Sequence, residues 1–211
     1  MSIEQEFIKK LEGLARRKDE DPQARATLAK LRRGLGKTPG DTPEMYPFVQ
    51  PLIWGIGKDD EDRFYLVAAL FASHQISWSA SDETSSYYRN MGESLRRFTG
   101  AKREAAKSTE RRFAALLQCD RNTLPNHLHH AVALLKTAEL PIDWGQLLWD
   151  IARWEEDETK GKKLTPIQRD WERERKPAQR SWARAFWQDA IDTEQNDPDA
   201  DSDETLNEEG V

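Results

Sequence analysis

The chain has 211 residues, 37% of them hydrophobic, which is enough to bury a core without disulfides or metals. Its single cysteine, Cys119, excludes an internal disulfide and fits a reducing cytoplasm; no stretch approaches the roughly 18 apolar residues of a membrane span, and the N-terminus lacks the apolar core of a secretory signal. The net charge of −6 argues at first against a nucleic-acid partner.

Apolar residues at spacings of three and four predict helices along most of the chain. The expected helices cover residues 3–14, about 22–35, 45–56, 62–77, 92–98, 108–119, 123–137, 144–154, a segment from Thr165, and the stretch around 182–187. Ser108 and Asp143 are the expected N-caps, and Pro177 is expected to kink or split the last helix. Since no segment alternates polar and apolar residues as a strand does, the pattern predicts an all-α fold.

The acidic residues are concentrated at the C-terminal end. Residues 189–211 contain ten acidic side chains and no lysine or arginine, so residues 1–188 carry a net charge of +4. A mildly basic body with clustered arginines can hold phosphate even when the whole chain is acidic. The composition of the tail predicts disorder, and the tail is interpreted as a solubilising segment or, alternatively, as a nucleic-acid mimic that covers the basic face.

A first basic group lies between residues 30 and 37. On a helix, Lys30, Arg33 and Lys37 share one stripe, at positions i, i+3 and i+7. Gly34 beside them would let a phosphate backbone approach closely. The alternative is a solvated helix face, which composition by itself favours.

The largest local excess of positive charge lies between residues 96 and 121, where eight basic side chains oppose three acidic ones. Arg96 and Arg97 open this group, Arg111 and Arg112 follow the expected helix start, and Arg121 closes it. Because arginines near a helix start are unfavourable to the helix dipole, their position suggests that they serve a partner.

The histidines invite a metal or catalytic interpretation. His127, His129 and His130 lie close together, but there is no second cysteine, no HExxH spacing and no carboxylate on the same turn. No nucleophile signature is present either. We therefore expect no metal, no cofactor and no catalysis, and a polar surface or RNA-contacting role for the histidines. Trp149, off the apolar stripe of its helix, is the tryptophan best placed to stack on a base.

Five segments occur in a characteristic order. They are LRRGLGKTPGDTPEMYPFV (31–49), GESLRRF (92–98), STERRFAALLQCDRNTLPNHLHHAVALLK (108–136), PIDWGQLLWDIARW (141–154) and RSWARAFW (180–187). Each motif is weak by itself, but their order and spacing extend over roughly residues 7–190. In this arrangement the chain resembles the CasB family, the small subunit of the type I-E CRISPR surveillance complex Cascade.

The resemblance implies two small packed helical bundles without catalytic activity, which we place at residues 1–100 and 101–190, followed by a disordered acidic tail at 191–211. The implied partners are CRISPR RNA and target DNA, the repeated backbone subunit and the large subunit of Cascade, and a second copy of the chain. No membrane is implied. In such a complex the subunit helps to hold target DNA in the R-loop by contacts that do not read sequence.

The implied basic surface is matched here by Arg32, Arg33, Arg111, Arg112, Arg121, Arg180 and Arg184. Relatives often carry a basic pair where this chain has His129 and His130, so the chain departs from the family pattern at these two positions. Combined with the basic groups above, the candidate nucleic-acid-binding residues are Lys30, Arg32, Arg33, Lys37, Arg96, Arg97, Arg111, Arg112, Arg121, His130, Arg180 and Arg184.

The function expected from the sequence is thus that of a non-catalytic Cascade subunit whose basic surface binds the nucleic-acid backbone and stabilises guided target binding in antiviral defence. The alternative is a purely structural assembly subunit whose arginines pair with acidic partner proteins. A metal-dependent nuclease would need convergent carboxylates or histidines that the sequence does not display.

Overall fold

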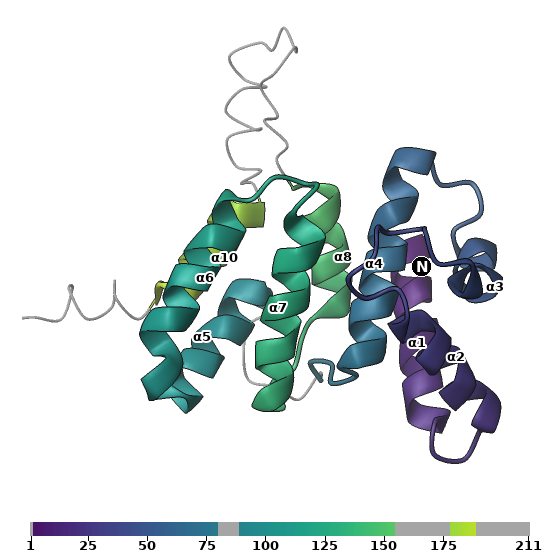
Figure 1. Ribbon diagram of the computed structural model, residues 1–211, viewed down its shortest axis with the longest axis horizontal. Coiled ribbons are helices and arrows are strands. Elements are labelled where there is room, and N and C mark those ends of the chain that lie inside the picture. The colour runs from purple at the N-terminus through teal and green to yellow at the C-terminus, as the bar shows by residue number, and fades with distance from the viewer. Residues whose placement is uncertain (1, 80–88, 155–177, 189–211) are drawn as a thin grey trace, which may run out of the picture.

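The computed structural model describes residues 2–79, 89–154 and 178–188, which form an all-α fold, as the sequence predicts (Figure 1). The only pairing of extended backbone within these ranges is a parallel bridge between Ser77 and Ile142. None of the helices they contain is long and apolar enough to cross a lipid bilayer. The predicted helix from Thr165, the kink at Pro177 and the acidic tail lie outside the described residues.

The N-terminal half contains three long helices, α1 (Ile3–Arg17), α2 (Pro22–Arg32) and α4 (Lys58–Ser73). α1 begins with a capping box, in which the Ser2 hydroxyl accepts the Gln5 N–H and the Gln5 side chain accepts the Ser2 N–H. Phe7 of α1 packs edge-on against Phe64 of α4, with ring centres 5.0 Å apart. The apolar faces that the amphipathic pattern predicts therefore pack together in a core shared by these helices.

The predicted helix over residues 45–56 is wrong. The segment folds as three short pieces, η1 (Pro43–Met45), α3 (Tyr46–Val49) and η2 (Gln50–Leu52). Pro47 and Pro51 lack the N–H that a continuing helix needs. After η2 the chain turns at Gly55, whose φ of +88° favours glycine, and the turn leaves Trp54 86% exposed.

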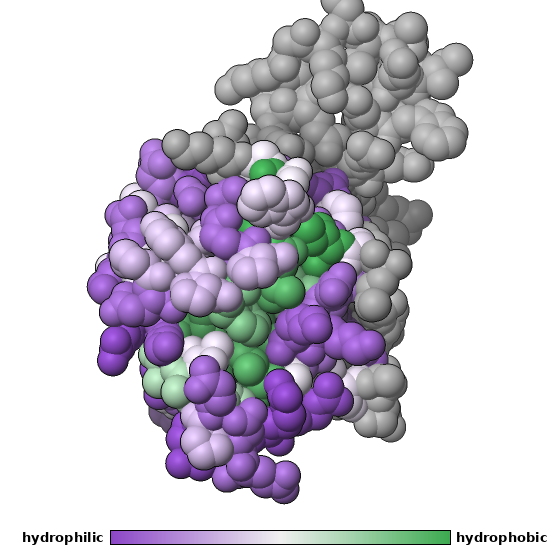
Figure 2. Space-filling model, turned by 90° about the vertical axis from the view of Figure 1, so that its right-hand side faces the viewer, coloured by the Kyte–Doolittle hydropathy of each residue, from purple (hydrophilic) through white to green (hydrophobic). Residues whose placement is uncertain are grey.

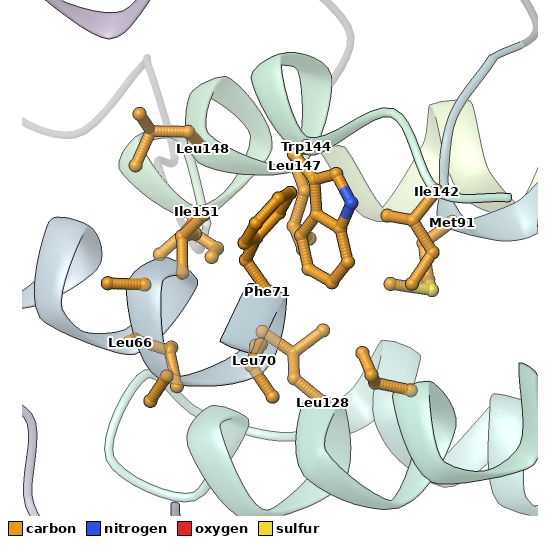
Figure 3. Close-up of a cluster of buried hydrophobic side chains, with 14 of the residues drawn as sticks. Leu66, Leu70, Phe71, Met91, Leu128, Ile142, Trp144, Leu147, Leu148 and Ile151 are labelled. Carbon is orange, nitrogen blue, oxygen red and sulfur yellow. The ribbon is translucent and has the colours of Figure 1, made fainter. Parts of the chain in front are cut away.

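α4 is the central helix, because every residue from Phe64 to Ala72 is buried. It packs against α2, α7 and α8 (Trp144–Ala152), and Figure 3 shows Phe71 beside Trp144, with ring centres 5.5 Å apart. The helix lies four residues earlier than the predicted 62–77. It ends at Ser73 because His74 has extended backbone, which leads into the bridge at Ser77.

The C-terminal half contains α5 (Met91–Ala101), η4 (Arg103–Ala105), α6 (Ala106–Gln118), α7 (Leu124–Thr137), α8 and α10 (Ala178–Phe186). α5 packs against α6, α7 and α10, whereas α8 packs against α1 and α4 (Figure 1). One cluster of buried apolar residues therefore extends through both halves. The division into two bundles at residue 100 stays a prediction.

Of the two N-caps expected from the sequence, one is right. Asp143 accepts the Gln146 N–H at 2.8 Å and starts α8. The N-cap at Ser108 is wrong, since α6 already begins at Ala106. The Ser108 hydroxyl instead donates to the carbonyl of Ala105 at 2.9 Å, within the first turn.

α10 is held in the core by two close contacts. Trp182 is fully buried, and its indole N–H donates to the Asp150 carboxylate of α8 at 2.6 Å. A Cβ at Gly92 of α5 would overlap the backbone of Trp182, so the two helices meet with no side chain between them. The position of α10 therefore depends on Gly92, Asp150 and Trp182 together.

Candidate nucleic-acid interface

Two of the predicted basic residues close the C-terminal ends of helices inside the chain. The Arg32 guanidinium donates to the carbonyl of Ala72, at the end of α4, at 3.0 Å. Arg121 donates to the carbonyls of Ile151 and Ala152, at the end of α8, at 3.1 and 2.7 Å. A cation at the C-terminus of a helix satisfies carbonyls that lack intrahelical partners and complements the helix dipole. These two arginines have a structural role that the sequence does not reveal.

Arg96 and Arg97 share one buried carboxylate. Glu93, 2% exposed, accepts two hydrogen bonds from Arg96 at 2.8 and 3.0 Å and one from Arg97 at 2.8 Å. The Arg97 guanidinium also lies over the Trp78 ring, 4.2 Å from its centre. Since a buried charge must be paired, both arginines are needed inside the chain whatever else they contact.

The predicted stripe of Lys30, Arg33 and Lys37 is not formed. α2 ends at Arg32, and the chain turns at Gly36 with a φ of +70°, so Lys37 lies beyond the helix. Arg33 pairs with Glu44 at 3.3 Å, and Lys30 and Lys37 are exposed.

Gly34 does not offer a surface for phosphate. A Cβ there would lie 2.5 Å from Met45 Sδ and 3.3 Å from the Ala69 side chain. The glycine is thus explained by close packing against the molecule's own core.

The exposed arginine pair of the second basic group lies on α6. Arg111 and Arg112 are exposed, and neither makes an ion pair or hydrogen bond with a described residue. Arg112 lines a groove of about 510 Å³ between α6 and α7, together with His127 and His130 of α7. We call Arg111, Arg112 and His130 the α6–α7 basic surface. The packing of the consecutive helices α6 and α7 thereby places Arg112 and His130 on one groove, and Arg111 is exposed next to Arg112 on α6; side chains of these types are suited to a phosphate chain.

His127, for which the sequence predicts a polar surface or RNA-contacting role, is not among the candidate binding residues, but it lines this groove. It lies one turn before His130 on α7 and lines the groove with Arg112. The i, i+3 spacing of His127 and His130 can be read from the sequence, but the packing of α6 against α7 cannot. The His129 ring stacks on the His130 ring, with ring centres 5.9 Å apart.

Arg180 and Arg184 project from α10 one turn apart. Both are exposed, as the amphipathic pattern of α10 requires, while Trp182 and Phe186 face the core. Phe186 stacks on Phe113 of α6 with ring centres 4.3 Å apart, which fixes α10 beside α6.

The acid groups of the described residues offer no metal centre. No three of their histidine, cysteine, aspartate or glutamate side chains lie together as metal ligands would. The most perturbed acid is Asp150, because burial raises its pKa to about 6 although hydrogen bonds from Trp182 and Gln146 lower it. Its partners are an indole and an amide in the core, so its shift is explained by packing.

Comparisons with known proteins place these features in a family context. Residues 27–187 match the family model of the CRISPR-associated protein Cse2. A CRISPR-associated protein Cse2 from Thermus thermophilus is 34% identical over 137 residues, which cover 61% of this chain and 69% of that protein.

Solved structures give the same result. The crystal structure of CasB from M. ruber is 31% identical and covers 92% of this chain and 98% of that one, with a TM-score of 0.64. CasB from Thermus thermophilus is 28% identical over 89% of this chain and 99% of that one, with a TM-score of 0.62. A chain of a CRISPR RNA-guided surveillance complex is 25% identical over 90% and 97%, with a TM-score of 0.63.

Proposed function

Because the chain belongs to the CRISPR-associated protein Cse2 family, whose crystal structures bear the name CasB, we propose that it is the non-catalytic small subunit of a Cascade-type, CRISPR RNA-guided surveillance complex. Its partners are then the CRISPR RNA, the target DNA, the backbone and large subunits of the complex and a second copy of the chain, all in the cytoplasm. The likeness to a chain of such a complex supports this assignment.

The observation that carries a nucleic-acid role is the α6–α7 basic surface. Arg111 and Arg112 are exposed cations whose donors are not used by described neighbours, in contrast to Arg32 and Arg121. Exposed guanidinium groups bind phosphate with two parallel hydrogen bonds. Arg180 and Arg184, which are exposed on the neighbouring α10, add two further cations, and contacts of this kind hold a backbone without reading bases.

The physical task matches such a surface. Guide pairing reads the target sequence, and exchanging DNA pairs for RNA–DNA pairs is nearly balanced in free energy. A few phosphate contacts to an opened strand therefore suffice to favour the R-loop, and their contribution weakens with salt.

The test is target binding by the reconstituted complex with and without this subunit, at two salt concentrations, on a guide-matched duplex. We expect omission to weaken binding and to flatten its salt dependence. Equal affinity and equal salt dependence of the two complexes would reject the nucleic-acid role.

A purely structural assembly role is the second candidate, and exposed apolar side chains favour it. Trp54 is 86% exposed in the turn after η2, and Tyr46 of α3 is 42% exposed. Figure 2 shows hydrophobic side chains in a hollow ringed by hydrophilic ones on the side of the molecule where α1, α2 and α3 lie. Large aromatic side chains are frequent anchors of protein interfaces. Under this role, omission would impair assembly, but complexes that do form would bind target normally.

A further inference from the structure

The groove between α6 and α7 has the properties of a site for an apolar side chain with acidic neighbours. Phe113 and Leu116 of α6 line it, with Ala131 and Leu134 of α7. Arg112 and the imidazoles of His127 and His130 line it as well. An occupant has to bring an apolar group for the floor and negative charge for the edge.

The chain itself leaves the described fold beside this groove. Trp187, directly after α10, packs against Phe113 at 5.4 Å between ring centres, and its indole N–H donates to Glu110 at 3.2 Å. Since successive helical residues are 100° apart, Glu110, Arg111 and Arg112 step around the outside of α6. The chain therefore leaves Trp187 on the side of α6 that carries Glu110. The groove opens on the side of α6 that carries Arg112, and Arg111 lies between these two sides.

The residues after this point carry the complementary chemistry. Leu206 is one of the few apolar residues of the acidic stretch 189–211, and Asp203, Glu204, Glu208 and Glu209 flank it. The 18 residues from Asp189 to Leu206 reach up to roughly 60 Å when extended, whereas a helix with its side chains is only about 10 Å across. The tail is therefore long enough for Leu206 to reach the groove on the other side of α6.

We propose that the acidic tail docks on this chain's own α6–α7 groove, with the Leu206 side chain on the apolar floor and the flanking carboxylates against Arg111 and Arg112. The attachment is intramolecular, so even weak contacts act at an effective concentration of about millimolar. Resting on the function proposed above, the inference adds that the tail and nucleic acid compete for one surface. Nucleic acid displaces the tail in the assembled complex, and the tail discourages binding of unrelated polyanions by the free subunit.

Cysteine cross-linking in the full-length chain tests the docking without nucleic acid. In a Cys119→Ser background, Asn207→Cys, which keeps Leu206, is combined with Ala133→Cys, an exposed position in the groove, or with Ala29→Cys, an exposed position on α2. At low salt we expect the intramolecular disulfide to form about tenfold faster at position 133 than at position 29, as a local gain in effective concentration requires. Equal rates at the two positions would overturn the proposal.

Charge neutralisation supplies the second arm. Replacing Asp203 and Glu204 with Asn and Gln, and Glu208 and Glu209 with Gln, removes four negative charges and leaves Leu206 in place. We expect this change to lower the cross-linking rate at position 133 to that at position 29 and to raise affinity of the free subunit for single-stranded DNA several-fold. Unchanged cross-linking would refute the proposed pairing of the flanking carboxylates with Arg111 and Arg112.

The two proposals fail separately. If the tail cross-links as expected but the neutralised and unmodified chains bind DNA equally poorly, then docking stands and the nucleic-acid role of this surface falls. If DNA protects position 133 from thiol modification while the tail never cross-links there, the docking is wrong and the nucleic-acid role stands.

Discussion

Asp150 makes the fold depend on pH in a direction that can be worked out. Its side chain is 6% exposed, and its carboxylate accepts hydrogen bonds from Trp182 at 2.6 Å and Gln146 at 2.8 Å. Burial raises the pKa of Asp150 from 3.8 to about 6. Between these values the native chain keeps a proton that the unfolded chain has lost. The free energy of unfolding therefore falls as pH rises from about 4 to 6, and then levels off.

The size of this effect follows from the shift. A difference of about two pKa units corresponds to about 3 kcal/mol at neutral pH. Asp150→Asn removes the titration and keeps the shape, since the amide oxygen can accept the Trp182 N–H while the Gln146 amide turns to accept from the new donor. We therefore expect the stability of the wild type relative to this variant to decrease by about 2 kcal/mol between pH 4 and pH 7, since part of the loss has already occurred at pH 4.

Urea unfolding followed by tryptophan fluorescence at pH 4, 5, 6 and 7 measures this difference. Taking the difference between two chains cancels the carboxyl groups that do not interact with Asp150; Asp143, whose pKa burial also raises, does interact with it and contributes to the measured difference. Asp150→Ala is the matched control, because it leaves the indole and amide donors without an acceptor and is expected to be destabilised at every pH. A wild-type minus Asp150→Asn difference that is flat or rises with pH would refute the reasoning.

Two further predictions concern the contacts that hold the candidate interface. Gly92→Ala places a methyl group against the Trp182 backbone. We expect the free energy of unfolding, measured by thermal unfolding, to fall by about 3 kcal/mol or more. A decrease below about 1 kcal/mol would contradict the close approach of α5 and α10. Arg121→Ala removes the charged hydrogen bonds to the carbonyls of Ile151, which still accepts the Trp154 N–H, and of Ala152. We expect the free energy of unfolding to fall by about 1–3 kcal/mol and hydrogen exchange to show faster opening of the end of α8, whereas unchanged stability would remove the structural role.

The sequence allowed the helices to be predicted because helix formation leaves a local pattern. The faces of α6 and α7 follow from apolar residues at spacings of three and four. The ends were less predictable. Ser108 has the residue type of an N-cap, but whether a serine accepts an N–H or donates to a carbonyl depends on where the chain enters the helix.

The candidate site was harder to predict than the fold, since charge alone does not say what an arginine contacts. Arg32 and Arg121 find carbonyls 40 and 31 residues away, and no local pattern reveals such partners. The sharing of Glu93 by Arg96 and Arg97 did have a signal, because the spacings are i, i+3 and i, i+4 on one helix. An arginine should therefore be assigned to a nucleic-acid surface only after its hydrogen bonds to helix C-termini and buried carboxylates within the chain have been identified.

R-loop lifetime in the reconstituted complex tests the central claim most directly. Arg111 and Arg112 are replaced with Ala, and the control is the replacement of Lys9 and Lys10, an exposed adjacent pair in the middle of α1. If the α6–α7 basic surface holds phosphate, the arginine variant shortens the lifetime and lowers the salt slope of binding by about two, one for each lost phosphate contact, while the lysine variant does neither. An R-loop of unchanged lifetime and salt slope in the arginine variant would contradict the account.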